Sequence, residues 1–169
     1  MSRKGWLIIG IYILILLLAG WFLFGNKLVP EKEIHYHAGF VVFQDNKKLD
    51  FSDIKYMHAK PCGDEEEDEH SPEEEQIEKA HLHDYVGDVV HVHREDSKWK
   101  DLFTNLKFTV GYSKATAYIN GEKIDNFENQ IINPYDSIVI FIGENDLKFI
   151  KDAVTKKYIM EVEKKGESC

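Results

Sequence analysis

The sequence predicts an α+β fold in which one helix packs across a mixed β-sheet and a second helix follows at the C-terminus. Three observations lead to this prediction. Short runs of aromatic and β-branched residues are typical of strands, one segment between them has the apolar spacing of a helix, and an Asn-Gly dipeptide is typical of a hairpin turn. The order is hairpin, insertion, hairpin, helix, hairpin and tail helix, which favours the α+β class.

The first half of the expected sheet consists of two hairpins. Residues 34–43 form the first expected strand, and residues 48–52 are its expected hairpin partner. Residues 80–95 predict a second hairpin whose loop spans residues 85–87. We expect Gly87 to adopt the left-handed conformation that such a loop requires.

The second half begins with the helix. Ser97 is its expected cap, and its apolar residues recur at i, i+3, i+4 and i+7, namely Trp99, Leu102, Phe103 and Leu106. Residues 115–120 form a strand that enters the Asn120-Gly121 turn, and residues 136–142 form the last strand. The globular domain is thus expected at residues 34–143. The C-terminal helix and tail are expected at residues 144–169, with Leu147, Ile150, Val154 and Tyr158 on the apolar face.

Charge is distributed unevenly along the 169 residues. All 30 acidic residues lie beyond residue 30 together with 18 of the 21 basic residues, so residues 31–169 carry a formal charge of −12. A field of this sign repels phosphate backbones and attracts cations. Nucleic acid is therefore excluded as an expected partner, whereas a metal ion is favoured.

The N-terminal segment predicts a membrane anchor. The stretch from Trp6 to Phe24 contains no charged side chain and is long enough to span a bilayer as a helix, which we place at residues 6–25. Arg3 and Lys4 assign the tip, residues 1–5, to the cytoplasm, so residues 26–33 are a linker and the domain lies outside the cell membrane. A cleaved signal peptide is the alternative, and it predicts the same compartment.

An acidic insertion interrupts the domain at residues 62–78. Nine of the twelve residues from 64 to 75 are acidic, and none of the twelve can contribute to an apolar core, so a solvated, mobile segment is expected. Calcium binding is the alternative, although the spacing differs from that of a calcium loop. His70 lies within this run and is expected to be solvated.

Six of the eight histidines form three His-x-His pairs. Residues i and i+2 of a strand point to the same face, so each pair presents two imidazoles side by side. In both expected hairpins the apolar residues occupy even positions and the histidines odd positions, so the histidines are expected to face away from the core. The candidate metal ligands are His35, His37, His81, His83, His91 and His93.

Copper and zinc are the expected ions, because imidazole binds both and both are available outside the membrane. Asp84, Asp88 and Glu95 are candidates for orienting the imidazole rings. A less favoured group, Met57, His58 and Cys62, has the donors that suit Cu(I). Two alternatives remain for it: Met57 is a core residue, or Cys62 forms a disulfide with Cys169.

Two resemblances accompany these patterns. The segment AYINGEKIDNFENQIINPYDSIVIFIG, about 30 residues, resembles the closing half of β-grasp (ubiquitin-like) domains, which implies a β-grasp-like mixed sheet. The N-terminal anchor followed by H-x-H-A-G-F, H-L-H-D-x-x-G-D-V-V-H-V-H and Y-x-N-G resembles a group of small uncharacterised membrane-anchored proteins of archaea and small-genome bacteria. The second resemblance implies no activity.

Three functions are compatible with the sequence. The favoured one is a membrane-anchored metal-binding domain, and the alternatives are an interaction module whose histidines sense pH and an unrecognised metalloenzyme. Enzymatic activity is the less favoured interpretation, because the chain lacks the motifs of hydrolases and nucleotide-using enzymes.

Overall fold

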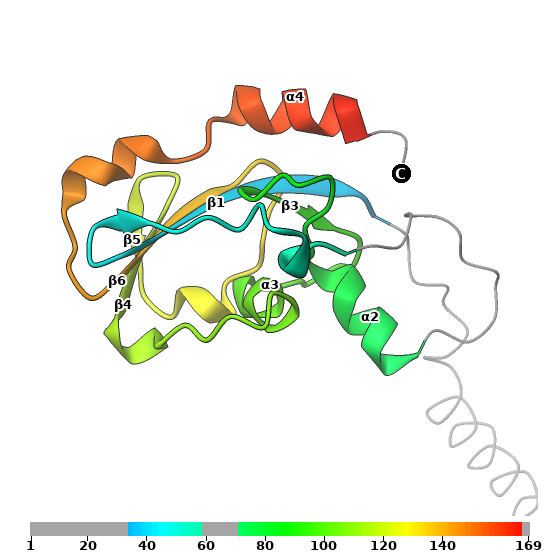
Figure 1. Cartoon of the computed structure of the whole chain (residues 1–169), viewed down its shortest axis with the longest axis horizontal. Helices are drawn as coiled ribbons and strands as arrows, with labels where there is room; N and C mark the ends of the chain where they lie inside the picture. Colours follow the sequence, from blue (N-terminus) through cyan, green and yellow to red (C-terminus); the bar gives the residue numbers. More distant parts are fainter. Residues whose placement is uncertain (1–33, 59–70, 167–169) are drawn as a thin grey trace, which may run out of the picture. The chain divides into compact units, whose positions relative to one another are not determined.

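The structure is a computed structural model that describes residues 34–58 and 71–166 (Figure 1). The expected membrane segment at residues 6–25, with its tip and linker, lies outside the described residues, as do Cys62, His70 and Cys169. Within the described part of the chain, none of the helices has the length and apolar composition needed to cross a membrane.

Six strands form one mixed sheet, which confirms the α+β class. They are β1 (Tyr36–Gln44), β2 (Lys47–Lys48), β3 (Val89–Val92), β4 (Ala115–Ile119), β5 (Glu122–Ile124) and β6 (Ser137–Ile142). Their order is β2-β1-β6-β4-β5, and β3 pairs with β1 on the same side as β2. The central strands β1 and β6 are parallel, and every other named pair is antiparallel.

Three α-helices accompany the sheet in the described residues, one more than expected. They are α2 (Pro72–Lys79), α3 (Trp99–Asn105) and α4 (Lys156–Gly166), and four short 3₁₀ segments lie between the other elements: η2 (Ile54–Tyr56), η3 (Tyr112–Lys114), η4 (Phe127–Asn129) and η5 (Leu147–Asp152). The additional helix α2 occupies the second half of the acidic insertion. It begins with a capping box between Ser71 and Glu74 and has no buried residue.

Helices α3 and α4 cover opposite faces of the sheet (Figure 1). On the α3 face, the even positions of β1 pack with the expected helix residues, so Phe40, Val42, Trp99, Leu102 and Phe103 share one core cluster. On the α4 face, Val41 and Phe43 pack with Ile159 and Val162. Both faces of β1 are therefore buried: its odd positions face away from the α3 core, as expected, and are covered by α4.

The C-terminal helix is split into two elements. The predicted apolar face runs across η5 and α4, and two of its members are exposed, Leu147 at 57% and Tyr158 at 40%. The side chain of Thr155 accepts the Tyr158 N–H at 3.2 Å and starts α4. Within α4, Ile159 and Val162 face the sheet, and Ile150 and Val154 of the predicted face pack in the same cluster.

Two local predictions at helix and hairpin ends are also wrong. Ser97 does not cap α3, because the capping position is Lys98, and the Ser97 hydroxyl donates to the Arg94 carbonyl at 2.7 Å. In the segment 80–95, only β3 is a regular strand. The left-handed residues of its turn are Asp84 (φ 56°) and Tyr85 (φ 59°), not Gly87. Gly87 is required for space, since a β-carbon there would collide with the backbone nitrogen of Ser52.

Candidate metal centre

Four neighbouring chain segments bring seven histidines together. β1 pairs with β3 so that His37 lies opposite His91, and an isolated antiparallel bridge joins His81 to His91. A further bridge joins Met57 to Leu82 and places His58 next to this group. The histidines from these segments make a continuous set of ring contacts, and we call this set the histidine cluster: His35, His37, His58, His81, His83, His91 and His93.

The register in the second histidine segment agrees with the prediction. His81 and His91 exchange both backbone hydrogen bonds, at 2.9 and 3.0 Å, so odd positions lie opposite odd positions. The apolar residues at the even positions, Leu82, Val90 and Val92, are fully buried in the core on the α3 side. Histidines at odd positions of this segment therefore share the opposite face.

Most of the histidine cluster is buried, which was not expected. The exposed fraction is 0% for His37, 1% for His91, 5% for His81 and 8% for His83. His93 is partly buried, and His35 is exposed. The four most buried of these histidines are therefore not solvated residues of a strand surface.

His91 is the centre of the cluster. Its Nδ1 lies 2.7 Å from His83 Nε2 and 3.3 Å from His35 Nε2, and its own Nε2 lies 2.8 Å from His37 Nε2. Each nitrogen of this one buried ring thus faces the nitrogen of another imidazole.

Two carboxylates lie next to the rings that flank His91, one beside His83 and one beside His37. Asp84 Oδ2 lies 2.8 Å from His83 Nδ1, and Glu163 Oε1, from α4, lies 3.6 Å from His37 Nδ1. Asp84 is one of the three orienting residues that the sequence suggested. Of the other two, Asp88 pairs with Lys48 at 4.0 Å, and Glu95 is exposed.

The hydrogen bonds determine where the ring protons are. A carboxylate only accepts, so His83 carries its proton on Nδ1 and its Nε2 accepts from His91 Nδ1. His91 Nε2 then accepts from His37 Nε2. The last lone pair is on His37 Nδ1, a buried atom that has no hydrogen-bond partner among the described residues and faces Glu163. The path from Asp84 to Glu163 therefore has four contacts and only three ring protons.

Burial favours the neutral form of His35, His37 and His91. It is the largest cause lowering the pKa of His35, His37 and His91, and for His37 and His91 a neighbouring histidine is the next cause. Burial also lowers the pKa of His81 to about 3 and that of His93 to about 4. Only neutral imidazole binds metal ions, so the electrostatics favour coordination.

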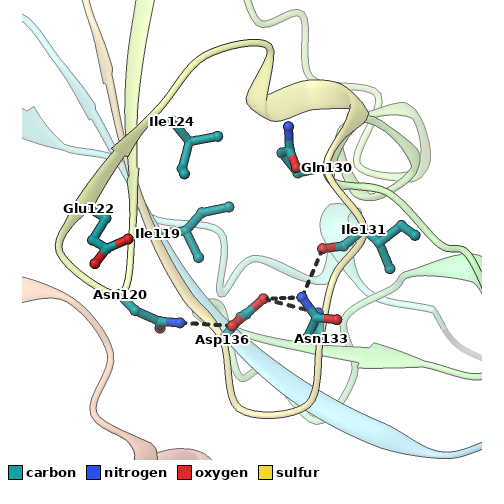
Figure 2. Close-up of a pocket in the computed structure, with 8 residues that line it drawn as sticks. All are labelled: Ile119, Asn120, Glu122, Ile124, Gln130, Ile131, Asn133 and Asp136. Atoms are coloured by element: carbon teal, nitrogen blue, oxygen red, sulfur yellow. Dashed lines mark hydrogen bonds between the residues drawn. The ribbon is translucent and has the colours of Figure 1, made fainter.

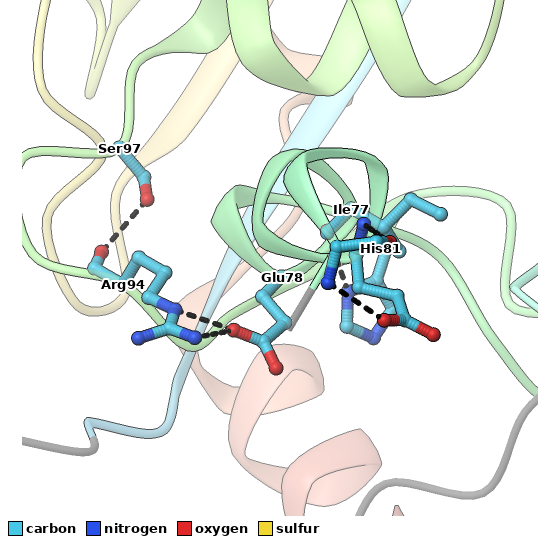
Figure 3. A network of polar contacts seen from close by, with 7 residues as sticks. Ile77, Glu78, His81, Arg94 and Ser97 are labelled. Carbon is cyan, nitrogen blue, oxygen red and sulfur yellow. Dashed lines mark hydrogen bonds and ion pairs between the residues drawn. The ribbon is translucent and has the colours of Figure 1, made fainter. Parts of the chain in front are cut away.

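Helix α2 orients one ring of the cluster (Figure 3). His81 Nδ1 lies 3.1 Å from the carbonyl oxygen of Ile77, in the last turn of α2. In the same turn, the Glu78 carbonyl accepts a hydrogen bond from the backbone N–H of His93. The Glu78 carboxylate forms an ion pair with Arg94. The helix within the acidic insertion is thus attached to the histidine cluster at two points.

Three of these histidines satisfy the distance requirement for a metal site. The donor atoms of His35, His37 and His91 all lie within 4.8 Å of one another, so the group could hold a metal ion. The less favoured group is only partly described: Met57 packs against the core, the His58 ring lies 5.2 Å from that of His81, and Cys62 is outside the described residues.

Glu163 is the residue that sequence reasoning missed. It lies in an ordinary amphipathic helix, 126 positions after His37 in the sequence, and nothing in its local pattern distinguishes it from the neighbouring acidic residues. Only the position of α4 over the odd face of β1 brings it to the histidine cluster.

A pocket between β4, β5 and the segment before β6 offers no comparable chemistry (Figure 2). Its polar groups bind one another, since Asp136 accepts from the Asn120 side chain at 2.8 Å and from the Asn133 side chain at 3.0 Å. Asn120 also accepts the Ser137 N–H at 2.9 Å. These contacts join the Asn-Gly turn to β6, which is a structural role.

Comparison with known proteins adds no family assignment. The chain matches no protein-family model, no curated protein and no solved structure. Functional inference therefore depends on the residues of the chain itself.

Proposed function

We propose that this protein is a membrane-anchored domain that binds a divalent copper or zinc ion outside the cell membrane. The ion binds at His35, His37 and His91, and His83 orients His91. The observation that carries the proposal is the convergence of three imidazole donors within 4.8 Å of one another, two of them fully buried. Such a donor set suits copper and zinc.

The acceptors behind the rings support the same assignment, because a metal ion at His37 Nε2 moves the ring proton from Nε2 to Nδ1. A metal-bound histidine usually donates its other ring N–H to an oxygen acceptor. His37 has this arrangement when its Nε2 binds the ion, because its Nδ1 then carries the proton toward Glu163. His91 donates from Nδ1 to His83, which in turn donates to Asp84. A cation bound between His37 and His91 thus takes the place of the fourth proton that the four contacts from Asp84 to Glu163 would need.

The overall charge and the N-terminal sequence support the location. Residues 31–169 carry a formal charge of −12, which attracts cations to the domain, and the uncharged stretch of residues 6–24 has the composition of a membrane anchor. Protease added to intact cells is expected to digest the domain. Protection that persists until lysis contradicts this orientation.

The sheet also supports a β-grasp-like description of residues 34–143. The Asn120-Gly121 turn joins β4 to β5, and Asp136 directly precedes β6, which are the places that the resemblance implies. We treat this fold type as part of the proposal.

The direct test is a metal titration of the full-length chain, purified in detergent without a histidine tag. Elemental analysis is expected to detect copper or zinc, and calorimetry is expected to show binding that weakens as pH falls below about 6. His91→Gln, which keeps a polar side chain at this buried position, is expected to weaken binding at least about tenfold. His35→Ala tests an exposed member of the same site. Binding by both variants as tight as that of the parent contradicts the proposal.

A further inference from the structure

The rings of His81 and His93 take no part in the nitrogen–nitrogen contacts centred on His91. The buried nitrogens His81 Nε2 and His93 Nε2 have no hydrogen-bond partner among residues 34–58 and 71–166. Buried polar atoms are normally paired, so two unpaired nitrogens on neighbouring rings require an explanation.

The lone pair on His81 can be assigned. The Ile77 carbonyl oxygen is an acceptor only, so the proton of the neutral ring is on Nδ1 and Nε2 carries a lone pair. A backbone carbonyl behind one ring nitrogen is one of the arrangements that orients metal-bound histidines. His81 therefore has the tautomer and the orientation of a metal ligand.

The His81 ring contacts two further histidine rings. The His81 and His93 rings are nearly parallel, at an interplanar angle of 8° and a centroid distance of 5.4 Å, and the His58 ring lies 5.2 Å from His81. Backbone hydrogen bonds fix the flanking segments, from His58 N to the Leu82 carbonyl at 2.7 Å and from His93 N to the Glu78 carbonyl at 3.0 Å. The donors thus come from three chain segments that are already held together.

We propose that His58, His81 and His93 form a second site for Zn²⁺ or Cu²⁺, so that the chain binds two ions side by side. The inference rests on the proposed function, because it adds a neighbouring ion to the site of His35, His37 and His91. The two sites adjoin where the His93 ring stacks on that of His35, with centroids 4.7 Å apart and an interplanar angle of 12°.

Binding draws the parallel rings together. Two nitrogens bound to one tetrahedral ion at about 2.0 to 2.1 Å lie about 3.3 Å apart, so the His81 and His93 rings tilt toward each other as the ion enters. The carboxylates beside the cluster, Asp84 and Glu163, offset part of the charge of two divalent ions.

The test is a count of bound ions. The full-length chain in detergent, without a tag, is loaded with Zn²⁺, dialysed, and measured for zinc and protein. We expect about two zinc ions per chain, falling to about one in His93→Gln and to about one in His35→Ala. A Co²⁺ titration of the unaltered chain, followed by its visible absorption, is expected to show two binding steps and does not depend on the folding of any variant.

The outcomes separate the two proposals. One ion per unaltered chain, or two ions retained in His93→Gln, overturns the second site and leaves the proposed function intact. No bound ion overturns both. A single step in the Co²⁺ titration that saturates at one ion also overturns the second site.

Discussion

The carboxylate of Glu163 contacts two side chains. It accepts the Tyr135 hydroxyl at 2.9 Å and faces His37 Nδ1 at 3.6 Å, and its side chain is 25% exposed. The hydrogen bond from Tyr135 fixes the carboxylate beside the ring. When a metal ion binds His37 Nε2, Glu163 is thus placed to hold the ring proton on Nδ1.

Replacing Glu163 by Gln tests this role. The amide keeps the size of the side chain but loses the negative charge, so we expect metal affinity to fall about 10- to 100-fold. Calorimetric titration with Zn²⁺ measures the effect. Glu161→Gln is the matched control, because Glu161 is an exposed residue of the same helix that pairs with Lys157 at 3.7 Å. Equal affinity of the two variants contradicts the role of Glu163.

Gly87 and Gly111 differ in the space around them, and this difference gives a second prediction. Gly87→Ala drives a β-carbon into the backbone of Ser52 and is expected to lower the free energy of unfolding by about 1 to 3 kcal/mol. Gly111→Ala adds a β-carbon where nothing lies within 4 Å and φ is −74°, so its effect is expected to stay within about 0.5 kcal/mol. Urea unfolding of both variants decides, and similar stability for the two contradicts the packing argument.

The alternation of histidines and apolar residues along the strands was the feature of the candidate site that could be predicted from the sequence. Alternation along a strand depends only on local sequence. The prediction that Leu82 and Val90 lie on one face and His81 and His91 on the other was therefore correct. Burial of the histidines was not predictable in this way. It depends on elements that cover the odd face, and Glu163 reaches His37 only through the packing of α4 on β1.

Elements with a strong local signal were predicted well. The Asn120-Gly121 turn has two left-handed residues, at φ 52° and 86°, as a type I′ hairpin requires, and it joins β4 to β5. The segment 80–95 lacks such a signal, because its turn uses Asp84 and Tyr85 in the left-handed region. Tertiary contacts with β1 and with the segment before His58 hold it instead.

Helix α2 is held by one side chain of α3. The Asn105 amide donates to the carbonyls of Gln76 at 2.8 Å, Ile77 at 3.3 Å and Ala80 at 2.7 Å, at the end of α2 where carbonyls lack helical partners. Since the Ile77 carbonyl also orients His81, Asn105 connects α3 to the histidine cluster through α2.

The third prediction concerns this contact. Asn105→Ala removes these contacts with the carbonyls and the hydrogen bond that the Gln76 side chain donates to Asn105 Oδ1 at 3.3 Å. It is expected to cost about 1 to 3 kcal/mol of stability, with faster amide hydrogen exchange in residues 72–80. Thr104→Ala is the control on the same helix, since Thr104 donates only to the exposed Lys100 carbonyl at 2.8 Å. Unchanged exchange in α2 of Asn105→Ala, or an equal change in Thr104→Ala, contradicts the assigned contact.

For the whole molecule, the buried histidines make the stability of the fold depend on pH, because folding favours their neutral form. Folding lowers the pKa of these histidines from 6.5. The pKa falls to about 3 for His81 and to about 4 for His93. Between those values and 6.5 the unfolded chain binds more protons than the folded chain. Stability therefore rises with pH across this interval and is complete above it.

The fourth prediction follows from that sign. The metal-free, full-length chain, treated with a chelator, is expected to keep its full free energy of unfolding above about pH 6.5 and to lose it progressively as pH falls toward 4. Urea midpoints measured at intervals of half a pH unit test this. His93→Gln removes one group whose pKa is lowered to about 4, so its stability is expected to fall less steeply below pH 6.5.

With Zn²⁺ present the decline is expected to be steeper than in the metal-free chain, because protonated imidazole releases the ion and its binding energy is lost together with the fold. A metal-free chain whose stability is flat or rises between pH 6.5 and 4.5 contradicts burial of neutral rings, whereas a decline that Zn²⁺ leaves unchanged contradicts only the metal site.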